Sequence, residues 1–207
     1  MKKREMILNG PASAELVLIL AHGAGAPMDH PFMEYFATKL AGPSCRVARF
    51  EFPYMARRRT DGKRPGPDRE PKLRETWLAA IGAFAGKRIV IGGKSMGGRI
   101  ASLVADEAGV AGLVCLGYPF HPVGKPERLR TAHLENIETP TLILQGTRDT
   151  FGNREEVDQY KLSKRVSVHW LEDGDHSLKP RKSSGRTETQ NLQEAVDAIS
   201  EFMQGLI

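Results

Sequence analysis

The chain has 207 residues, of which 40% are hydrophobic and 27% are charged, and its formal net charge is +5. These values are ordinary for a globular protein, and the length allows one domain with a sizeable core. We therefore expect a single domain over residues 1–207. Apart from one segment the basic residues are spread along the chain, which argues against a nucleic-acid binder with a basic stripe on one face.

Neither a membrane span nor a metal site is predicted. The unbroken apolar run near the N-terminus covers six residues, 16–21, far fewer than the roughly 20 of a membrane-spanning helix. Cys45 and Cys115 each stand among apolar residues, which predicts buried free thiols in a reducing compartment. The histidines show no paired ligand spacing. We expect no metal, no organic cofactor, no membrane partner and a cytoplasmic location.

Short apolar strands and amphipathic helices alternate along the chain. The predicted strands are residues 16–21, 46–52, 88–91, 112–116, 141–144 and 166–171. The predicted helices are residues 32–40, residues 73–84, a segment that begins near Ile100, and residues 192–202. This alternation predicts an α/β fold, with a mostly parallel sheet of about six to seven strands and helices on both faces.

Residues 53–71 are rich in proline, glycine and charge, and they predict one long loop. The loop carries Arg57, Arg58 and Arg59 in a row. One interpretation is a solvated, mobile loop. The alternative is that its arginines attract a substrate that carries a carboxylate or phosphate, because arginine donates bidentate hydrogen bonds to such groups.

The stretch Gly93-Lys94-Ser95-Met96-Gly97 follows a predicted strand and precedes a predicted helix. A G-x-S-x-G sequence in this context is typical of a strained turn that exposes a nucleophilic serine. Glycines two residues on either side avoid collisions with the strand and the helix. The G-K-S letters also occur in phosphate-binding loops, but such a loop needs a further glycine where Arg88 stands. We therefore predict Ser95 as a nucleophile.

A serine nucleophile needs a base and an orienting carboxylate. Asp149 and His176 each follow a predicted strand, so they should meet Ser95 at the carboxyl edge of the sheet. Asp173 and Asp175 are rival acids, but they lie too close to His176 in sequence to occupy a loop of their own. We predict a triad of Ser95, His176 and Asp149.

Two backbone N–H groups should stabilise the oxyanion that forms during acyl transfer. One is that of Met96, directly after the nucleophile, and the other is that of Ala24 in the His22–Ala26 turn, with Gly25 as the alternative. The residues expected to contact the substrate are Gly23, Gly25, Tyr118 and Phe120, together with the loop at residues 53–71.

These motifs together resemble those of the small, lidless α/β-hydrolases, and most closely the dienelactone-hydrolase-like group that includes testis-expressed hydrolase-like proteins. The resemblance rests on five runs: residues 22–26, 93–99, 116–122, 145–149 and 175–177. It implies an α/β-hydrolase fold with no large cap domain, and a triad in the chain order serine, acid, histidine. Dienelactone hydrolases use a cysteine nucleophile, whereas position 95 is serine.

The expected function is that of a serine hydrolase that cleaves an ester or thioester of a small-molecule acyl substrate through an acyl-Ser95 intermediate. The alternative is a binding module that keeps the fold without catalysis, because fold alone does not fix chemistry.

Overall fold

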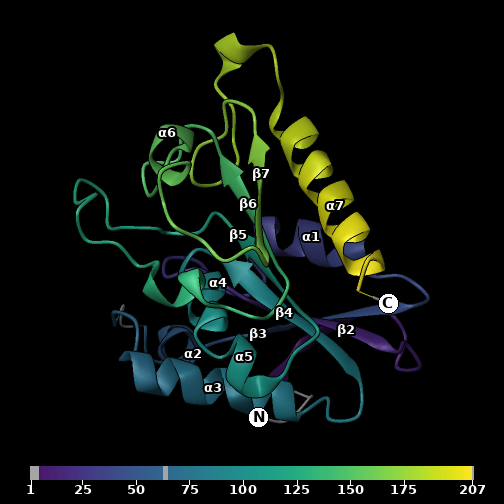
Figure 1. Cartoon of the computed structure of the whole chain (residues 1–207). Helices are drawn as coiled ribbons and strands as arrows, with labels where there is room; N and C mark the ends of the chain where they lie inside the picture. The colour runs from purple at the N-terminus through teal and green to yellow at the C-terminus, as the bar shows by residue number, and fades with distance from the viewer. Residues whose placement is uncertain (1–4, 63–64, 207) are drawn as a thin grey trace.

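A computed structural model describes residues 5–62 and 65–206, and within these ranges it forms one seven-stranded sheet (Figure 1). The strands are β1 (Ile7–Asn9), β2 (Leu16–Ala21), β3 (Cys45–Phe50), β4 (Arg88–Lys94), β5 (Gly112–Leu116), β6 (Thr141–Gly146) and β7 (Val166–Leu171). Their order is β1-β3-β2-β4-β5-β6-β7. Strand β1 pairs antiparallel with β3, and every other pair is parallel. The predicted mostly parallel sheet is confirmed.

Helices cover both faces of this sheet, as predicted. They are α1 (Pro31–Leu40), α2 (Pro53–Asp61), α3 (Glu70–Gly82), α4 (Met96–Ser102), α5 (Ala105–Ala108), α6 (Arg154–Val157) and α7 (Glu188–Gln204). Figure 1 shows α1 and α7 on one side of the sheet and α2 and α3 on the other. None of the connections in the described ranges forms a large cap domain.

Strand β2 shows how the two layers share one sheet. Successive side chains of a strand point to opposite faces. Val17 and Ile19 accordingly join the core beneath α2, α3 and α4, where Trp77 is fully buried. Leu18 and Leu20 join the core beneath α1 and α7. All six residues of β2 are buried, which explains its continuous apolar sequence.

The prediction of one long loop over residues 53–71 is wrong, because its first half forms helix α2. Pro53 stands in the first turn, where its missing N–H costs nothing. Tyr54 and Met55 are buried in the core and anchor the helix, while the three arginines project from its later turn. The helix ends at Gly62, which has a left-handed backbone, and residues 63–64 lie outside the described ranges.

The parallel arrangement determines where the candidate site residues lie. The carboxyl ends of β2, β4, β6 and β7 meet at one edge of the sheet, so that the segments following them become neighbours. The candidate site residues all follow these strands or β5. Within the described part of the chain, no helix has the length and apolarity to cross a bilayer.

Candidate active site

Ser95 occupies a strained turn between β4 and α4. Its φ is 50° and its ψ is −115°, a conformation that side-chain-bearing residues rarely adopt. The flanking glycines make the turn possible. A Cβ on Gly93 would lie 2.1 Å from the carbonyl oxygen of Ala21, and one on Gly97 would lie 2.5 Å from the same atom. Larger residues at either position would push β2 away from the nucleophile turn.

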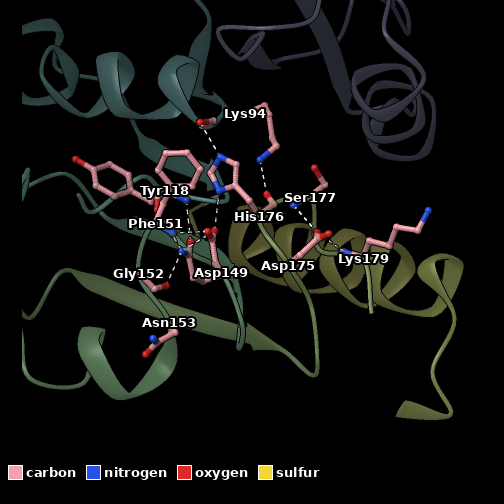
Figure 2. A network of polar contacts seen from close by, with 12 residues as sticks. Lys94, Tyr118, Asp149, Phe151, Gly152, Asn153, Asp175, His176, Ser177 and Lys179 are labelled. Carbon is pink, nitrogen blue, oxygen red and sulfur yellow. Dashed lines mark hydrogen bonds and ion pairs between the residues drawn. The ribbon is translucent and has the colours of Figure 1, made fainter. Parts of the chain in front are cut away.

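His176 lies between the hydroxyl of Ser95 and the carboxylate of Asp149 (Figure 2). Its Nε2 is 2.8 Å from Oγ of Ser95, and its Nδ1 is 2.8 Å from Oδ2 of Asp149. A proton on Nδ1, donated to the carboxylate, leaves Nε2 as a base facing the hydroxyl. The structure thus brings together the three residues that sequence reasoning selected.

The two rival acids make other contacts. Asp173 binds Arg181, with an N–O distance of 2.5 Å, and Arg148, at 2.9 Å. Asp175 accepts backbone N–H bonds from Ser177 and Lys179 (Figure 2). Both carboxylates therefore stabilise the loop that carries His176 without touching its imidazole.

Asp149 is fully buried and is held by two donors besides His176. Nε2 of Gln145 donates to Oδ2 at 2.9 Å, and the backbone N–H of Phe151 donates to Oδ1 at 2.9 Å. Gln145 is the penultimate residue of β6, and its role was not predicted from the sequence. A buried amide at the end of an apolar strand is the signal that could have identified it, because a buried polar side chain needs partners.

Burial is the main cause that lowers the pKa of His176 below its ordinary value. The hydrogen bond to Asp149 opposes this effect, and the positive charge of Lys94 adds to it. The Phe151 ring packs against the imidazole, with 4.2 Å between the ring centroids. The imidazole is therefore neutral near pH 7, as a general base must be.

The turn that follows β2 packs directly against the nucleophile. A Cβ on Gly23 would lie 3.7 Å from Cβ of Ser95 and 3.3 Å from Cγ of Lys94. The hydroxyl of Tyr54 lies 3.3 Å from the carbonyl oxygen of Gly23 and 3.1 Å from that of Ala24. Tyr54 was missed because its segment was interpreted as a loop.

His22 stabilises the same turn by hydrogen bonds made inside the core. Its Nδ1–H donates to the carbonyl of Gly23 at 2.6 Å, and its Nε2 accepts the backbone N–H of Phe52 at 3.1 Å. Burial lowers its pKa. His22 thus has a structural position, and the ring stays neutral because Nε2 accepts a hydrogen bond.

A cavity of about 670 Å³ opens beside Ser95 and His176. Its lining residues come mainly from the turn after β2, from α1 and from the His176 loop: Gly23, Ala24, Gly25, Ala26, His30, Pro31, Phe32, Met33, Tyr35, Lys94, Ser95, Phe151, His176, Ser177, Glu188 and Leu192. The predicted Gly23, Ala24 and Gly25 are among them. Met96 stands at the first position of α4.

The expectation that Tyr118 and Phe120 line the substrate cavity is wrong. Both side chains are fully buried. Figure 2 shows the Tyr118 hydroxyl directed away from His176, and it donates to the carbonyl of Arg130 at 2.9 Å. The chain turns inward at Gly117, whose φ is 67°, so the aromatic rings that follow enter the core.

The arginines of α2 do not line this cavity either. Arg59 pairs with Asp29 at 2.5 Å and with Glu51 at 2.7 Å, and Arg57 pairs with Asp68 at 2.6 Å. Arg58 donates to the carbonyl of Pro65. Their charges are therefore balanced or engaged locally. None of residues 53–62 and 65–71 lines the cavity, so the expectation that this segment contacts the substrate is wrong for them, and residues 63–64 lie outside the described ranges.

The two cysteines are free and buried, as predicted. Burial raises the pKa of Cys45 to about 11 and raises that of Cys115 still further, so both stay protonated and unreactive. Within residues 5–62 and 65–206, no group of three or more His, Cys, Asp or Glu side chains is arranged to hold a metal ion.

Comparisons with known proteins agree with this fold. A family model described as an alpha/beta hydrolase domain matches residues 14–204. An alpha-beta serine hydrolase homologue from Coxiella burnetii superposes with a TM-score of 0.70 at 18% identity, covering 95% of this chain and 89% of that one. A serine hydrolase without a lid from Xanthomonas campestris superposes with a TM-score of 0.71 at 15% identity, and the match covers 98% of this chain and 88% of that one. A dienelactone hydrolase from Anabaena variabilis superposes with a TM-score of 0.68 at 19% identity, and the match covers 97% of this chain and 90% of that one.

Proposed function

The chain belongs to the alpha/beta hydrolase family, and on that premise we propose that it is a serine hydrolase that cleaves carboxylic esters or thioesters. The observation that carries the proposal is the hydrogen-bonded series Ser95–His176–Asp149, with both distances at 2.8 Å, in the wall of a cavity. A hydroxyl so placed can lose its proton to an adjacent base as it attacks a carbonyl.

The reaction begins when Oγ of Ser95 attacks the substrate carbonyl carbon and Nε2 of His176 takes the hydroxyl proton. The imidazolium so formed is stabilised by Asp149, which keeps its own negative charge. His176 then gives the proton to the departing alkoxide or thiolate, which leaves an acyl-Ser95 ester. Water, deprotonated by the same imidazole, then attacks that ester. As the second intermediate collapses, the imidazolium gives its proton to the departing Oγ of Ser95, which releases the acid and restores the Ser95 hydroxyl.

The negative oxygen of each tetrahedral intermediate needs two donors. We assign them to the backbone N–H groups of Met96 and Ala24, with that of Gly25 as the alternative to Ala24. Two observations support this assignment. Met96 begins α4 directly after the nucleophile, and the carbonyls of Gly23 and Ala24 are bound by Tyr54 on the buried side of the turn.

The cavity favours small substrates. Its volume of about 670 Å³ lies within the usual range for small-molecule sites. Phe32, Met33 and Leu192 supply an apolar wall, suited to a short acyl chain or an aromatic ring. The buried free thiols favour a reducing compartment, so we place the reaction in the cytoplasm, with residues 1–207 acting as one catalytic domain.

The test is a series of 4-nitrophenyl esters and matched thioesters of increasing acyl length, assayed with the wild type, Ser95→Ala and the control Ser184→Ala. Ser184 is exposed in a short 3₁₀ turn. We expect hydrolysis that is best for short acyl groups, lost in Ser95→Ala and kept in Ser184→Ala. Equal turnover by the wild type and Ser95→Ala would contradict the proposal, and no turnover of any substrate would favour the non-catalytic binding module.

A further inference from the structure

The residue before the nucleophile, Lys94, ends strand β4 and extends its side chain along the cavity. Its Cγ passes the turn at Gly23, and its ammonium donates to the backbone carbonyl of His176 (Figure 2). The ammonium also lies 5.7 Å from the centroid of the Phe32 ring. Phe32, His176 and Lys94 all line the cavity, so the ammonium lies between two residues of the wall beside Ser95.

The partners of this ammonium leave its charge uncompensated. A carbonyl and an aromatic ring attract a cation but carry no formal negative charge. Asp149 and Asp175 are the carboxylates whose charge reaches Lys94. Each is engaged elsewhere, Asp149 by His176 and Gln145, and Asp175 by two backbone N–H groups. Among the described residues Lys94 forms no ion pair.

The other ionisable residues of the cavity wall are His30, Tyr35, His176 and Glu188. The Tyr35 hydroxyl donates to Oε1 of Gln193 at 3.4 Å. Glu188 pairs with Lys179 at 3.2 Å, and Nδ1 of His30 accepts the Phe32 N–H at the start of α1. Burial lowers the pKa of Lys94 to about 8, because a cation removed from water without a counter-ion is destabilised. A bound anion would supply the missing negative charge.

We propose that Lys94 makes this site selective for esters that carry a carboxylate, by binding that carboxylate with its ammonium while Ser95 attacks the ester carbonyl. A lysine offers three donors; one binds the His176 carbonyl, and Phe32 faces the ammonium without accepting a conventional hydrogen bond. The remaining capacity suits a carboxylate better than a phosphate, which is usually bound by several donors at once. This inference rests on the proposed hydrolase function and names its substrate class.

A binding measurement tests the charge selectivity without requiring turnover. Ser95→Ala is titrated with benzoate and with benzamide, a neutral molecule of similar shape. The same titrations are made with the double variant Ser95→Ala/Lys94→Gln and with the control Ser95→Ala/Arg74→Gln. The control removes the charge of Arg74, which lies on the exposed face of α3 and pairs with Glu107 of α5. We expect benzoate to bind about tenfold more tightly than benzamide, as a charge-assisted hydrogen bond provides. Lys94→Gln should abolish the difference and Arg74→Gln should keep it.

A kinetic measurement then tests selectivity during turnover. Two ester pairs are compared: 4-carboxyphenyl acetate with 4-acetylphenyl acetate, and 4-nitrophenyl hydrogen adipate with 4-nitrophenyl heptanoate. The readout is the ratio of kcat/KM for the charged ester to that for its neutral partner. In at least one pair this ratio should fall about tenfold in Lys94→Gln and stay constant in Arg74→Gln.

The outcomes separate the possible failures. Two results would overturn the proposal: equal binding of benzoate and benzamide, or a fall of kcat/KM in Lys94→Gln by the same factor for charged and neutral esters. Either result would leave Lys94 with the structural role of holding the His176 loop. Tighter binding of phenyl phosphate than of benzoate would overturn the choice of carboxylate. Failure of the hydrolase function itself would appear separately, as a wild-type protein that is inert towards a fluorophosphonate and towards every ester.

Discussion

Gln145 donates a hydrogen bond of 2.9 Å to Oδ2 of Asp149, the same carboxylate oxygen that lies 2.8 Å from Nδ1 of His176. The amide oxygen of Gln145 accepts the backbone N–H of Tyr118 at 2.7 Å. One side chain at the end of β6 therefore connects the segment after β5 to the acid of the triad. Gln145 positions Asp149 and, through it, the imidazole.

Gln145→Leu keeps the approximate volume of the side chain and removes its hydrogen bonds. We expect kcat to fall about tenfold to a hundredfold with little change in KM, and the free energy of unfolding to fall by about 1–3 kcal/mol. Without its amide donor Asp149 interacts more strongly with the imidazolium, so the acid limb of the pH–rate profile should move to higher pH. An unchanged profile with a loss of stability alone would reduce Gln145 to a structural residue.

Asp149→Asn should leave the protein folded and lower kcat by about 10⁴, because an amide can donate to Nδ1 and so stabilise the wrong imidazole tautomer. The matched control is Asp175→Asn, in which the amide oxygen can still accept the N–H groups of Ser177 and Lys179. The Asp175→Asn change should lower kcat by less than about tenfold. Steady-state kinetics with one activated ester decides between them, and the reverse ranking would make Asp175 the functional acid.

The lowered pKa of His176 predicts activity that persists into mildly acid solution. The neutral imidazole is the active form, so kcat/KM falls as pH drops through the His176 pKa, and that pKa lies below 6.5 because of burial and the charge of Lys94. A pH–rate profile of the wild type should place the acid limb below this value. In Lys94→Gln the limb should move upward, since a repelling charge is gone; a wild-type limb above 6.5 would show that burial does not dominate.

Tyr54→Phe removes the hydroxyl that binds the carbonyls of Gly23 and Ala24. If the turn must be held for the Ala24 N–H to stabilise the oxyanion, kcat should fall about tenfold at nearly constant KM. Tyr160→Phe is the control, because the ring of Tyr160 packs on Phe120 away from the cavity. Equal kinetics for the two variants would show that the Tyr54 hydroxyl does not support the turn.

The sequence was sufficient for the fold and for the positions of Ser95, Asp149 and His176. Ser95 lies in a local sequence pattern, although the atoms that require its glycines belong to Ala21 and His22 at the end of β2. Asp149 and His176 follow apolar strands, and parallel strands bring such positions to one edge of the sheet whatever their separation in the chain. These predictions needed only the serine motif, the apolar periodicity of the strands and their parallel arrangement.

The cavity could not be predicted in the same way. Whether Tyr118 points to the cavity or to the core depends on the backbone conformation of Gly117. The neighbouring residues of the sequence do not predict that conformation. Helix α2 is short and rich in arginine, and its buried anchors Tyr54 and Met55 are adjacent, so no helical periodicity appears. Lys94 lay within the recognised motif, but its role depends on contacts with Phe32 and His176, which only the folded chain brings together.

The most direct test of the central claim is reaction of the wild type with a fluorophosphonate, followed by intact-mass measurement and peptide mapping. Ser95 is expected to attack because His176 takes its proton. The hydroxyl of Ser102 also lies 2.8 Å from an imidazole, that of His133, but within the described residues only His176 is hydrogen-bonded both to a serine and to a carboxylate. We predict one adduct per chain, located on Ser95, with no adduct in Ser95→Ala and slow labelling in Asp149→Asn. An adduct on another serine, or none between mildly acid and alkaline pH, would contradict the claim that this chain is a serine hydrolase acting through Ser95.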